Sequence, residues 1–164
     1  MILVFAKAPV AGEVNTRLIP DIGIETATQL QAELIHSRLE ALQIKNLCAT
    51  QLWCAPDQHH AFFQNCKRQY AIELFTQQGA DLGERMSLAI KQSLQTFKRV
   101  VLIGTDAPSL TVAQIEIAIN KLEANDVVIA PAEDGGYVLI GMSRHCEDVF
   151  QSVPWGSDAV LETT

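Results

Sequence analysis

The stretch VVLIGTDAP (residues 100–108) decides how the rest of the chain can be arranged. Its first four residues are all apolar, which is typical of a strand that is covered on both faces of a sheet. Immediately after Ile103 the sequence turns to glycine, threonine, aspartate and proline. In an open parallel sheet, ligands bind beyond the carboxyl ends of the strands. The sequence therefore predicts that Asp106 lies at a ligand-binding edge.

Further apolar runs on both sides of this stretch alternate with longer amphipathic segments. We predict the other strands at residues 2–5, 47–54, 71–75, 127–130 and 137–140. We predict helices at residues 25–42, shortly after Pro56, and at 82–97 and 111–122. This order of elements predicts an α/β fold, a three-layer α/β/α Rossmann-like sandwich with a mostly parallel sheet. With no repeat or linker, residues 1–164 are predicted to form a single domain.

The helices carry apolar stripes that predict their buried faces. The stripe of the 25–42 helix consists of Ala27, Leu30, Leu34, Ile35, Leu39 and Leu42. The stripe of the 82–97 helix consists of Leu82, Met86, Ala89, Ile90, Leu94 and Phe97. Thr111 and Gln114 have the spacing of a capping box at the start of the last helix.

Composition excludes several classes of protein. The net charge of −7 argues against a nucleic-acid partner, because such binding depends on Lys and Arg at phosphates. No apolar stretch approaches the ~20 residues that span a bilayer, and no signal segment is visible, so we expect a cytoplasmic protein. The four cysteines form no C-x-x-C pair and are expected to be reduced structural thiols. An anionic ligand would need local positive groups, helix N-termini or a metal.

The loop after the first strand contains the basic residues Lys7 and Arg17, with Pro9, Gly12 and Asn15 between them. It matches neither the P-loop nor the dinucleotide-binding pattern. Two basic residues in a long loop of an acidic protein favour phosphate contact, and Gly12 would let the backbone approach the phosphates. The alternative is an ordinary solvated surface loop.

Asp106 follows a buried strand directly, on a rigid element beside Thr105. Carboxylates are hard oxygen ligands that suit Mg²⁺ or Mn²⁺, and either ion could bridge to a diphosphate. The alternative is that Asp106 caps the turn or the next helix. Pro108, Ser109 and Thr111 already supply signals for a helix start, so we favour the metal role. Thr105 joins the candidates for phosphate binding.

A third polar cluster follows the strand predicted at residues 127–130. Glu133 and Asp134 could supply a further metal ligand or a base, and Gly135 and Gly136 would admit a sugar close to the backbone. The alternative is a tight Asp-Gly turn. Asp81 opens a predicted helix and is a further phosphate-site candidate, with an N-cap role as its alternative.

Taken together, these segments resemble one family. They are, in order, AKAP (6–9) with GEVNTRL (12–18), QGADLGERM (78–86), GTDAPSL (104–110), PAEDGGY (131–137) and PW (154–155). The family is the small bacterial glycosyltransferase-like group of candidate nucleotide-diphospho-sugar transferases. The resemblance covers nearly the whole chain, and five motifs in order make it specific.

This resemblance implies a fold of the GT-A type with a nucleotide and divalent-metal site. By likeness, Asp106 is the metal aspartate and the loop from Lys7 to Arg17 lies over the phosphates. Asn15 stands where the family usually has Lys, which disfavours chemistry that must neutralise a triphosphate. The family also usually continues beyond residue 164, so acceptor-binding residues are expected in a further C-terminal part.

The leading hypothesis is glycosyl transfer from a nucleotide-diphosphate sugar to an unknown small-molecule acceptor. The metal and Arg17 would stabilise the departing diphosphate, and Asp134 or Glu133 would serve the acceptor as a base. Trp155 would stack on a sugar or base, or pack in the core. The alternatives are a nucleotidyltransferase that joins a nucleoside triphosphate to a phosphorylated small molecule, and a nucleotide-binding module without turnover. Base, sugar and oligomeric state stay open.

Overall fold

The structure is a computed structural model that describes residues 1–164. The strands are β1 (Ile2–Lys7), β2 (Thr50–Ala55), β3 (Glu73–Thr76), β4 (Val100–Ile103), β5 (Val127–Pro131) and β6 (Tyr137–Met142). The α-helices are α1 (Ile19–Ile22), α2 (Ile24–Lys45), α3 (Ala61–Tyr70), α4 (Leu82–Leu94), α5 (Val112–Lys121) and α6 (Val160–Thr163). Two 3₁₀ helices, η1 (Thr16–Leu18) and η2 (Glu147–Phe150), complete the fold.

One six-stranded sheet organises the molecule, with the strand order β3-β2-β1-β4-β6-β5. The pairs β3–β2, β2–β1 and β1–β4 are parallel. Strand β6 is antiparallel to both β4 and β5. The short loop between β5 and β6 explains this reversal, because a hairpin can join antiparallel strands whereas a parallel pair needs a crossover. The predicted mostly parallel α/β sheet is confirmed.

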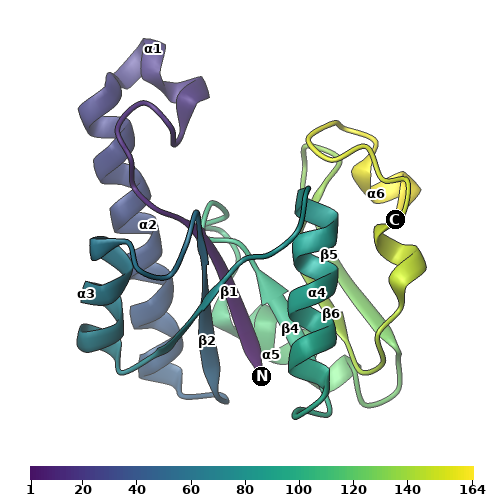
Figure 1. The fold of residues 1–164 in the computed structure, drawn as a ribbon. Coiled ribbons are helices and arrows are strands. Elements are labelled where there is room, and N and C mark those ends of the chain that lie inside the picture. The colour runs from purple at the N-terminus through teal and green to yellow at the C-terminus, as the bar shows by residue number, and fades with distance from the viewer.

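Helices cover both faces of the sheet, as Figure 1 shows. Successive residues of β1 point to opposite faces: Ile2, Val4 and Ala6 join one core cluster, and Leu3 and Phe5 join the other. The first cluster contains residues of α2, α3 and α5, and the second contains residues of α4 and η2. Because both faces of β1 and β4 are buried, these strands read as continuous apolar runs.

The buried faces of two helices differ from their predicted stripes. On α2 the buried residues include Gln31 and Arg38, whereas Leu30 and Leu34 are only half-buried. The buried face is therefore rotated toward two polar side chains that find partners in neighbouring loops. On α4, Leu82 is 47% exposed. It is the first residue of α4, directly after the N-cap Asp81.

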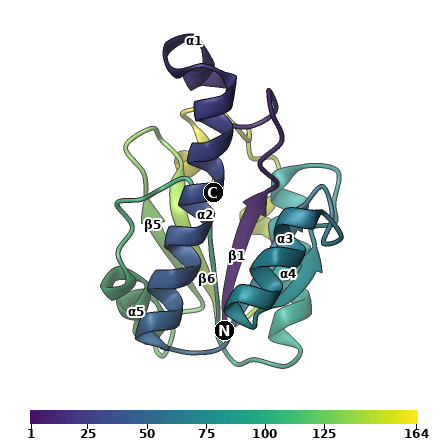
Figure 2. The same ribbon diagram turned by 90° about the vertical axis from the view of Figure 1, so that its left-hand side faces the viewer.

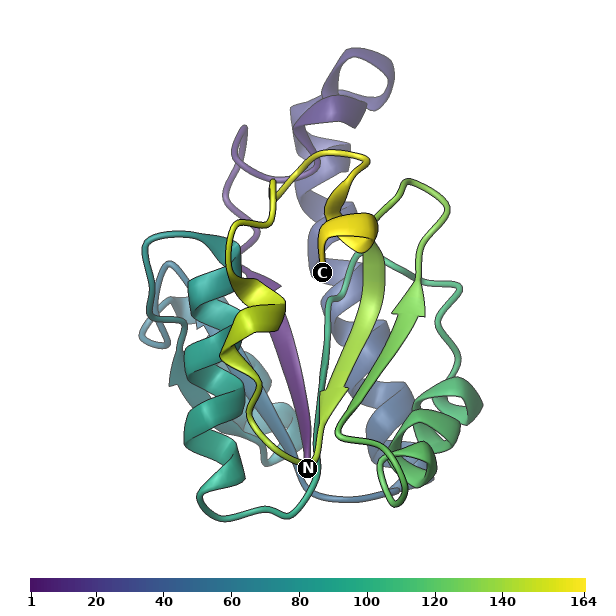
Figure 3. The ribbon, with the colours of Figure 1, turned by 90° about the vertical axis from the view of Figure 1, so that its right-hand side faces the viewer.

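The carboxyl ends of the parallel strands meet at one edge of the sheet, the upper edge in Figure 1. Helix α1 projects beyond this edge. Figure 2 shows the face of the sheet that α2 and α3 cover, with α2 running along its full height beside β1. In Figure 3 the C-terminal segment, in yellow, crosses the other face and returns to the same edge with α6. None of the helices is both long enough and apolar enough to cross a membrane.

All four cysteines are free, as predicted, and their surroundings predict an order of reactivity. Cys54 and Cys66 are fully buried, and burial raises the pKa of Cys54 to about 12 and that of Cys66 to about 11. Because the thiolate is the reactive form, both should react far more slowly with Ellman's reagent than the half-buried Cys48 and Cys146. The native protein should show two faster thiols and two protected ones, and all four should react in denaturant. Four equal rates in the native protein would contradict this packing.

Candidate active site at the carboxyl edge of the sheet

The predicted site residues come from strand ends that are neighbours in the sheet. Lys7 ends β1, and Asp106 follows β4, which pairs with β1. Strand β4 also pairs with β6, whose first residue follows the loop that holds Glu133 and Asp134. Sequence order placed these loops far apart, and the sheet brings them to adjacent positions on one edge.

The loop after β1 is fixed by its own polar contacts. The Lys7 Nζ donates to the carbonyl oxygen of Glu13 at 2.8 Å while the side chain stays exposed. Gly12 has a φ of 81° with open space where a Cβ would stand, and Pro9 is half-buried. Arg17 lies on η1 with an exposed side chain and no hydrogen-bond or ion-pair partner. The loop thus presents two solvent-accessible cationic side chains.

Asn15 turns its side chain toward helix α2. Its Nδ2 donates to the Ala27 carbonyl at 3.0 Å and to the Gln31 Oε1 at 3.3 Å. Its backbone is left-handed with a φ of 48°, a conformation that Asn tolerates better than most residues. In this structure Asn15 anchors the loop, and its predicted contact with a phosphate stays a prediction.

Asp106 is exposed and has no hydrogen bond or ion pair with the protein. A Cβ on Gly104 would lie 2.7 Å from the Asp106 Oδ1, so the glycine makes room for the carboxylate. No group of three or more His, Cys, Asp or Glu side chains could hold a metal by itself. One free carboxylate fits a divalent ion that takes its other ligands from water and a diphosphate, as Mg²⁺ commonly does.

Arg38 lies beneath the Asp106 loop and was missed by the sequence analysis. It is 7% exposed, and its Nη1 and Nη2 donate to the carbonyls of Leu110 and Ala107 at 2.6 and 2.7 Å. Burial lowers the pKa of the Arg38 guanidinium, and the negative charge of Asp106 raises it in part. The signal in the sequence was a cation within the apolar stripe of α2, seven residues after Gln31.

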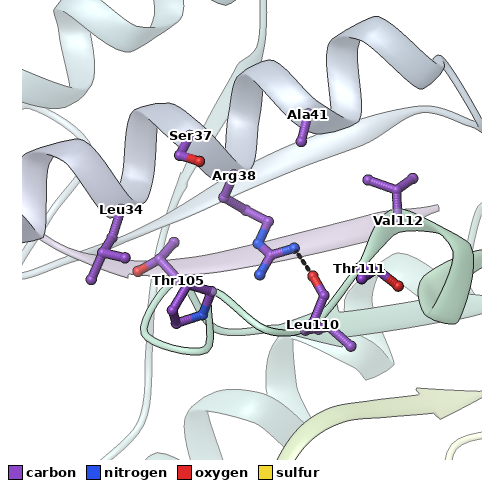
Figure 4. A pocket seen from close by; sticks show the side chains of 9 residues that line it. Leu34, Ser37, Arg38, Ala41, Thr105, Leu110, Thr111 and Val112 are labelled. Carbon is purple, nitrogen blue, oxygen red and sulfur yellow. Dashed lines mark hydrogen bonds between the residues drawn. The ribbon is translucent and has the colours of Figure 1, made fainter.

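A pocket of about 190 Å³ lies beside Arg38, between α2 and the start of α5. Figure 4 shows Arg38 reaching across it from α2 toward Leu110, with Thr105 at one side. Thr105 is buried and lines this pocket, whereas the neighbouring Asp106 is exposed. The phosphate contact predicted for Thr105 stays a prediction.

The loop between β5 and β6 forms a tight turn. The Gly136 nitrogen donates to the Asp134 Oδ1 at 3.1 Å, and the Ala132 nitrogen donates to the Gly136 carbonyl at 3.0 Å. Glu133 is exposed, and so is Asp134, which keeps its second carboxylate oxygen free. The turn explains Asp134 and Gly136 structurally, and it still leaves carboxylate oxygens available at the edge.

The C-terminal segment packs against Gly83 of α4 and against Gly135 in the loop between β5 and β6. A Cβ on Gly83 would lie 2.4 Å from the indole nitrogen of Trp155. Trp155 also packs edge-on against Tyr137, with 6.2 Å between the ring centroids. Packing was one of the two roles predicted for Trp155, beside stacking on a ligand. Tyr137 is held in this contact, and burial raises its pKa to about 12.

Asp81 has a defined structural role. Its Oδ1 accepts from the Glu84 nitrogen at 2.8 Å and caps α4, the alternative named for it. The Arg85 side chain, one turn further along α4, forms no ion pair with Asp81, and its Nε donates to the Gly79 carbonyl at 3.0 Å. Phosphate binding by Asp81 is not tested by these contacts.

Residues 28–157 match the family described as "Uncharacterized protein conserved in bacteria (DUF2064)". The structure of a candidate nucleotide-diphospho-sugar transferase from Desulfovibrio desulfuricans superposes with a TM-score of 0.89 and 33% identity, covering 99% of this chain and 71% of that one. A cytidylyltransferase from Leptospira borgpetersenii shares the fold alone, with a TM-score of 0.55, 14% identity and coverage of 87% and 59%. No curated protein matches. The sandwich fold and the transferase class that the sequence predicted are confirmed.

The two glycines with positive φ in the site loops provide a matched pair for a stability test. A Cβ on Gly135, at a φ of 82°, would come 1.9 Å from the Asp158 carbonyl oxygen, whereas one on Gly12, at 81°, would meet nothing. Gly12→Ala should therefore cost only the left-handed backbone, about 1–2 kcal/mol. Gly135→Ala should lower the melting temperature clearly further, because backbone must move. Equal losses in thermal unfolding would show that the C-terminal segment does not pack here.

Proposed function

This chain belongs to the bacterial DUF2064 family, and from that premise and the geometry of the site we propose that it is a metal-dependent glycosyltransferase with a nucleotide-diphosphate sugar as donor. The observation that carries the proposal is the Asp106 carboxylate, which is exposed, free of protein partners and given room by Gly104. It lies at the strand ends between a loop with two accessible cations and a turn with two carboxylates. The relative at 33% identity is itself described as a candidate nucleotide-diphospho-sugar transferase, which supports the donor class.

In this proposal the loop after β1 binds the diphosphate. Lys7 and Arg17 are exposed and have no carboxylate partner, so both can form charge-assisted hydrogen bonds to phosphate oxygens. Asp106 would hold Mg²⁺ or Mn²⁺, which on binding neutralises negative charge on the diphosphate leaving group. Arg17 would share that task, because its guanidinium can bind two phosphate oxygens at once.

The acceptor side is assigned to the turn between β5 and β6. Glu133 is exposed and has no hydrogen-bond or ion-pair partner, and Asp134 has one oxygen outside the turn. Either carboxylate could take the proton from an acceptor hydroxyl as the new glycosidic bond forms. Gly136, which has only the Asp134 side chain near its missing Cβ, leaves space for a sugar against the backbone.

Binding tests the donor and the metal ligand together. In a thermal-shift screen, one of UDP-glucose, ADP-glucose, GDP-mannose or dTDP-glucose with Mn²⁺ should stabilise the wild type. A ligand at about 100 times its Kd adds about 2.7 kcal/mol, which is roughly 5–10 °C for a chain of this size. Asp106→Asn should lose the metal-dependent part, because the amide is a weaker ligand without charge. Asp148→Asn, at an exposed aspartate on η2, is the matched control and should behave as wild type.

The outcome that contradicts the metal assignment is a Mn²⁺-dependent shift of the same size in Asp106→Asn. A protein that is folded and shows no shift with any sugar nucleotide or nucleoside triphosphate would contradict the whole proposal.

Product analysis separates the reaction types. With a bound sugar nucleotide, slow hydrolysis or transfer should release a nucleoside diphosphate, which ³¹P NMR distinguishes from pyrophosphate. Nucleotidyl transfer would instead consume a nucleoside triphosphate and release pyrophosphate. Glu133→Gln and Asp134→Asn should lower turnover without weakening donor binding, because both lie on the acceptor side. Tight binding without any product from either donor class would identify a nucleotide-binding module.

A further inference from the structure

Helix α2 buries two polar side chains, Gln31 and Arg38, on the face that packs against the sheet. Each is only 7% exposed. They are seven residues apart, which is about two turns or roughly 10 Å along the helix. A buried polar group is costly unless it is hydrogen-bonded, and a buried guanidinium especially so. The partners of these two side chains therefore show what the helix is built to hold.

Gln31 forms hydrogen bonds with both ends of the segment from Lys7 to Asn15, called the phosphate loop below because the proposal assigns phosphate binding to it. Its Nε2 donates to the Lys7 carbonyl at 3.0 Å, where the loop leaves β1. Its Oε1 accepts from the Asn15 Nδ2 at 3.3 Å, where the loop enters η1. One side chain thus closes the base of the segment between Lys7 and Asn15.

Arg38 likewise forms two hydrogen bonds with one loop, the Asp106 loop, which runs from Gly104 to Leu110. Its two terminal nitrogens donate to the carbonyls of Ala107 and Leu110, both short contacts on the stretch that follows Asp106. No carboxylate forms an ion pair with Arg38. The planar fork of arginine can reach two carbonyls in fixed geometry, which the single amine of lysine cannot do.

We propose that Gln31 and Arg38 are positioning residues that set the phosphate loop and the Asp106 loop at a fixed separation on one helix. The inference rests on the proposed function, because a metal held by Asp106 must reach oxygens of the same diphosphate that the phosphate loop binds. Misplacement of such groups by about 1 Å is enough to weaken the joint site strongly. The two side chains are held at a fixed distance from each other by the helix, and each forms hydrogen bonds with one of the two loops.

The proposal separates two effects that a purely structural role would not separate. Arg38 forms hydrogen bonds only with the Asp106 loop, so its loss should weaken metal binding and spare the affinity for nucleotide without metal. Gln31 forms side-chain hydrogen bonds only with the segment from Lys7 to Asn15, so its loss should weaken nucleotide binding even in the absence of metal. A general loss of packing on α2 would affect both together.

The experiment measures the two affinities in the full chain, with UDP, ADP and GDP as probes. Isothermal titration in EDTA gives nucleotide affinity, and Mn²⁺ electron paramagnetic resonance gives metal affinity in the nucleotide complex. Arg38→Lys should weaken Mn²⁺ binding by about 10-fold or more, as loss of groups that orient a ligand commonly does, and change metal-free nucleotide affinity by less than about twofold. Gln31→Leu should weaken metal-free nucleotide binding by about tenfold, because it removes the amide donor of the Lys7 carbonyl and one of the two acceptors of the Asn15 amide.

Two controls address folding. Leu39→Ala removes a buried apolar side chain from the same helix without touching a hydrogen bond to either loop. It should lower the melting temperature, and any loss of affinity that follows from the looser packing should be of equal size for metal and for nucleotide. In Arg38→Ala, millimolar guanidinium should restore part of the Mn²⁺ affinity, because the pocket of about 190 Å³ beside Arg38 gives the ion access. The same salt should not restore Gln31→Leu.

Equal losses of metal and nucleotide affinity in Arg38→Lys, matching those of Leu39→Ala, would overturn the positioning role while wild-type binding kept the proposed function intact. Unchanged Mn²⁺ affinity in Arg38→Lys would overturn it as well. If the folded wild type binds neither nucleotide nor Mn²⁺, the proposed function fails first, and the positioning role fails with it.

Discussion

Burial of the central strands on both faces is the constraint on which the rest of the structure depends. Strands β1 and β4 contribute side chains to two separate cores, so polar groups are confined to the loops beyond the strand ends. Because these strands are parallel, their carboxyl ends lie on the same edge. Lys7 and the Asp106 loop come together as a direct consequence of this arrangement, without any contact between their side chains.

Loops that leave a sheet lose the ladder hydrogen bonds that hold its strands, and their carbonyls need other donors. In this protein buried side chains from other elements supply them. Gln31 and Arg38 do so from α2. The half-buried Gln77, after β3, donates instead to carbonyls within β1 and β2, from its Nε2 to Ala6 and Trp53 at 3.3 and 2.9 Å. The loops of this edge are thus held by side-chain hydrogen bonds at their base, while the tips with Gly12 and Arg17 remain exposed. This division suits a site that must hold its ligating groups and still admit a ligand.

Much of the fold was predictable because it depends on local patterns. The apolar run of β4 and the capping box of α5 were both visible in the sequence, and the structure contains both. The buried face of α2 was predicted in part: Ala27, Ile35, Leu39 and Leu42 are buried as expected. The prediction missed Gln31 and Arg38, because their partners, Lys7 and Leu110, lie 24 and 72 positions away in the sequence. For the same reason, the sequence suggested which loops carry the site but could not show that Asn15 turns toward α2. Long-range hydrogen bonds leave no periodic signal.

The distribution of charge shows how so acidic a chain could attract a diphosphate. The two ion pairs of the protein, Arg99–Glu123 and Arg144–Asp126, lie at the opposite edge of the sheet, before β4 and after β6. The cations of the site, Lys7, Arg17 and Arg38, form no ion pair with a carboxylate. Yet Asp106, Glu133 and Asp134 place three carboxylates on the same edge, and three cations do little more than balance them. A ligand that brings two further negative phosphates would therefore need additional positive charge, and this is the physical reason why the proposal assigns a divalent cation to Asp106.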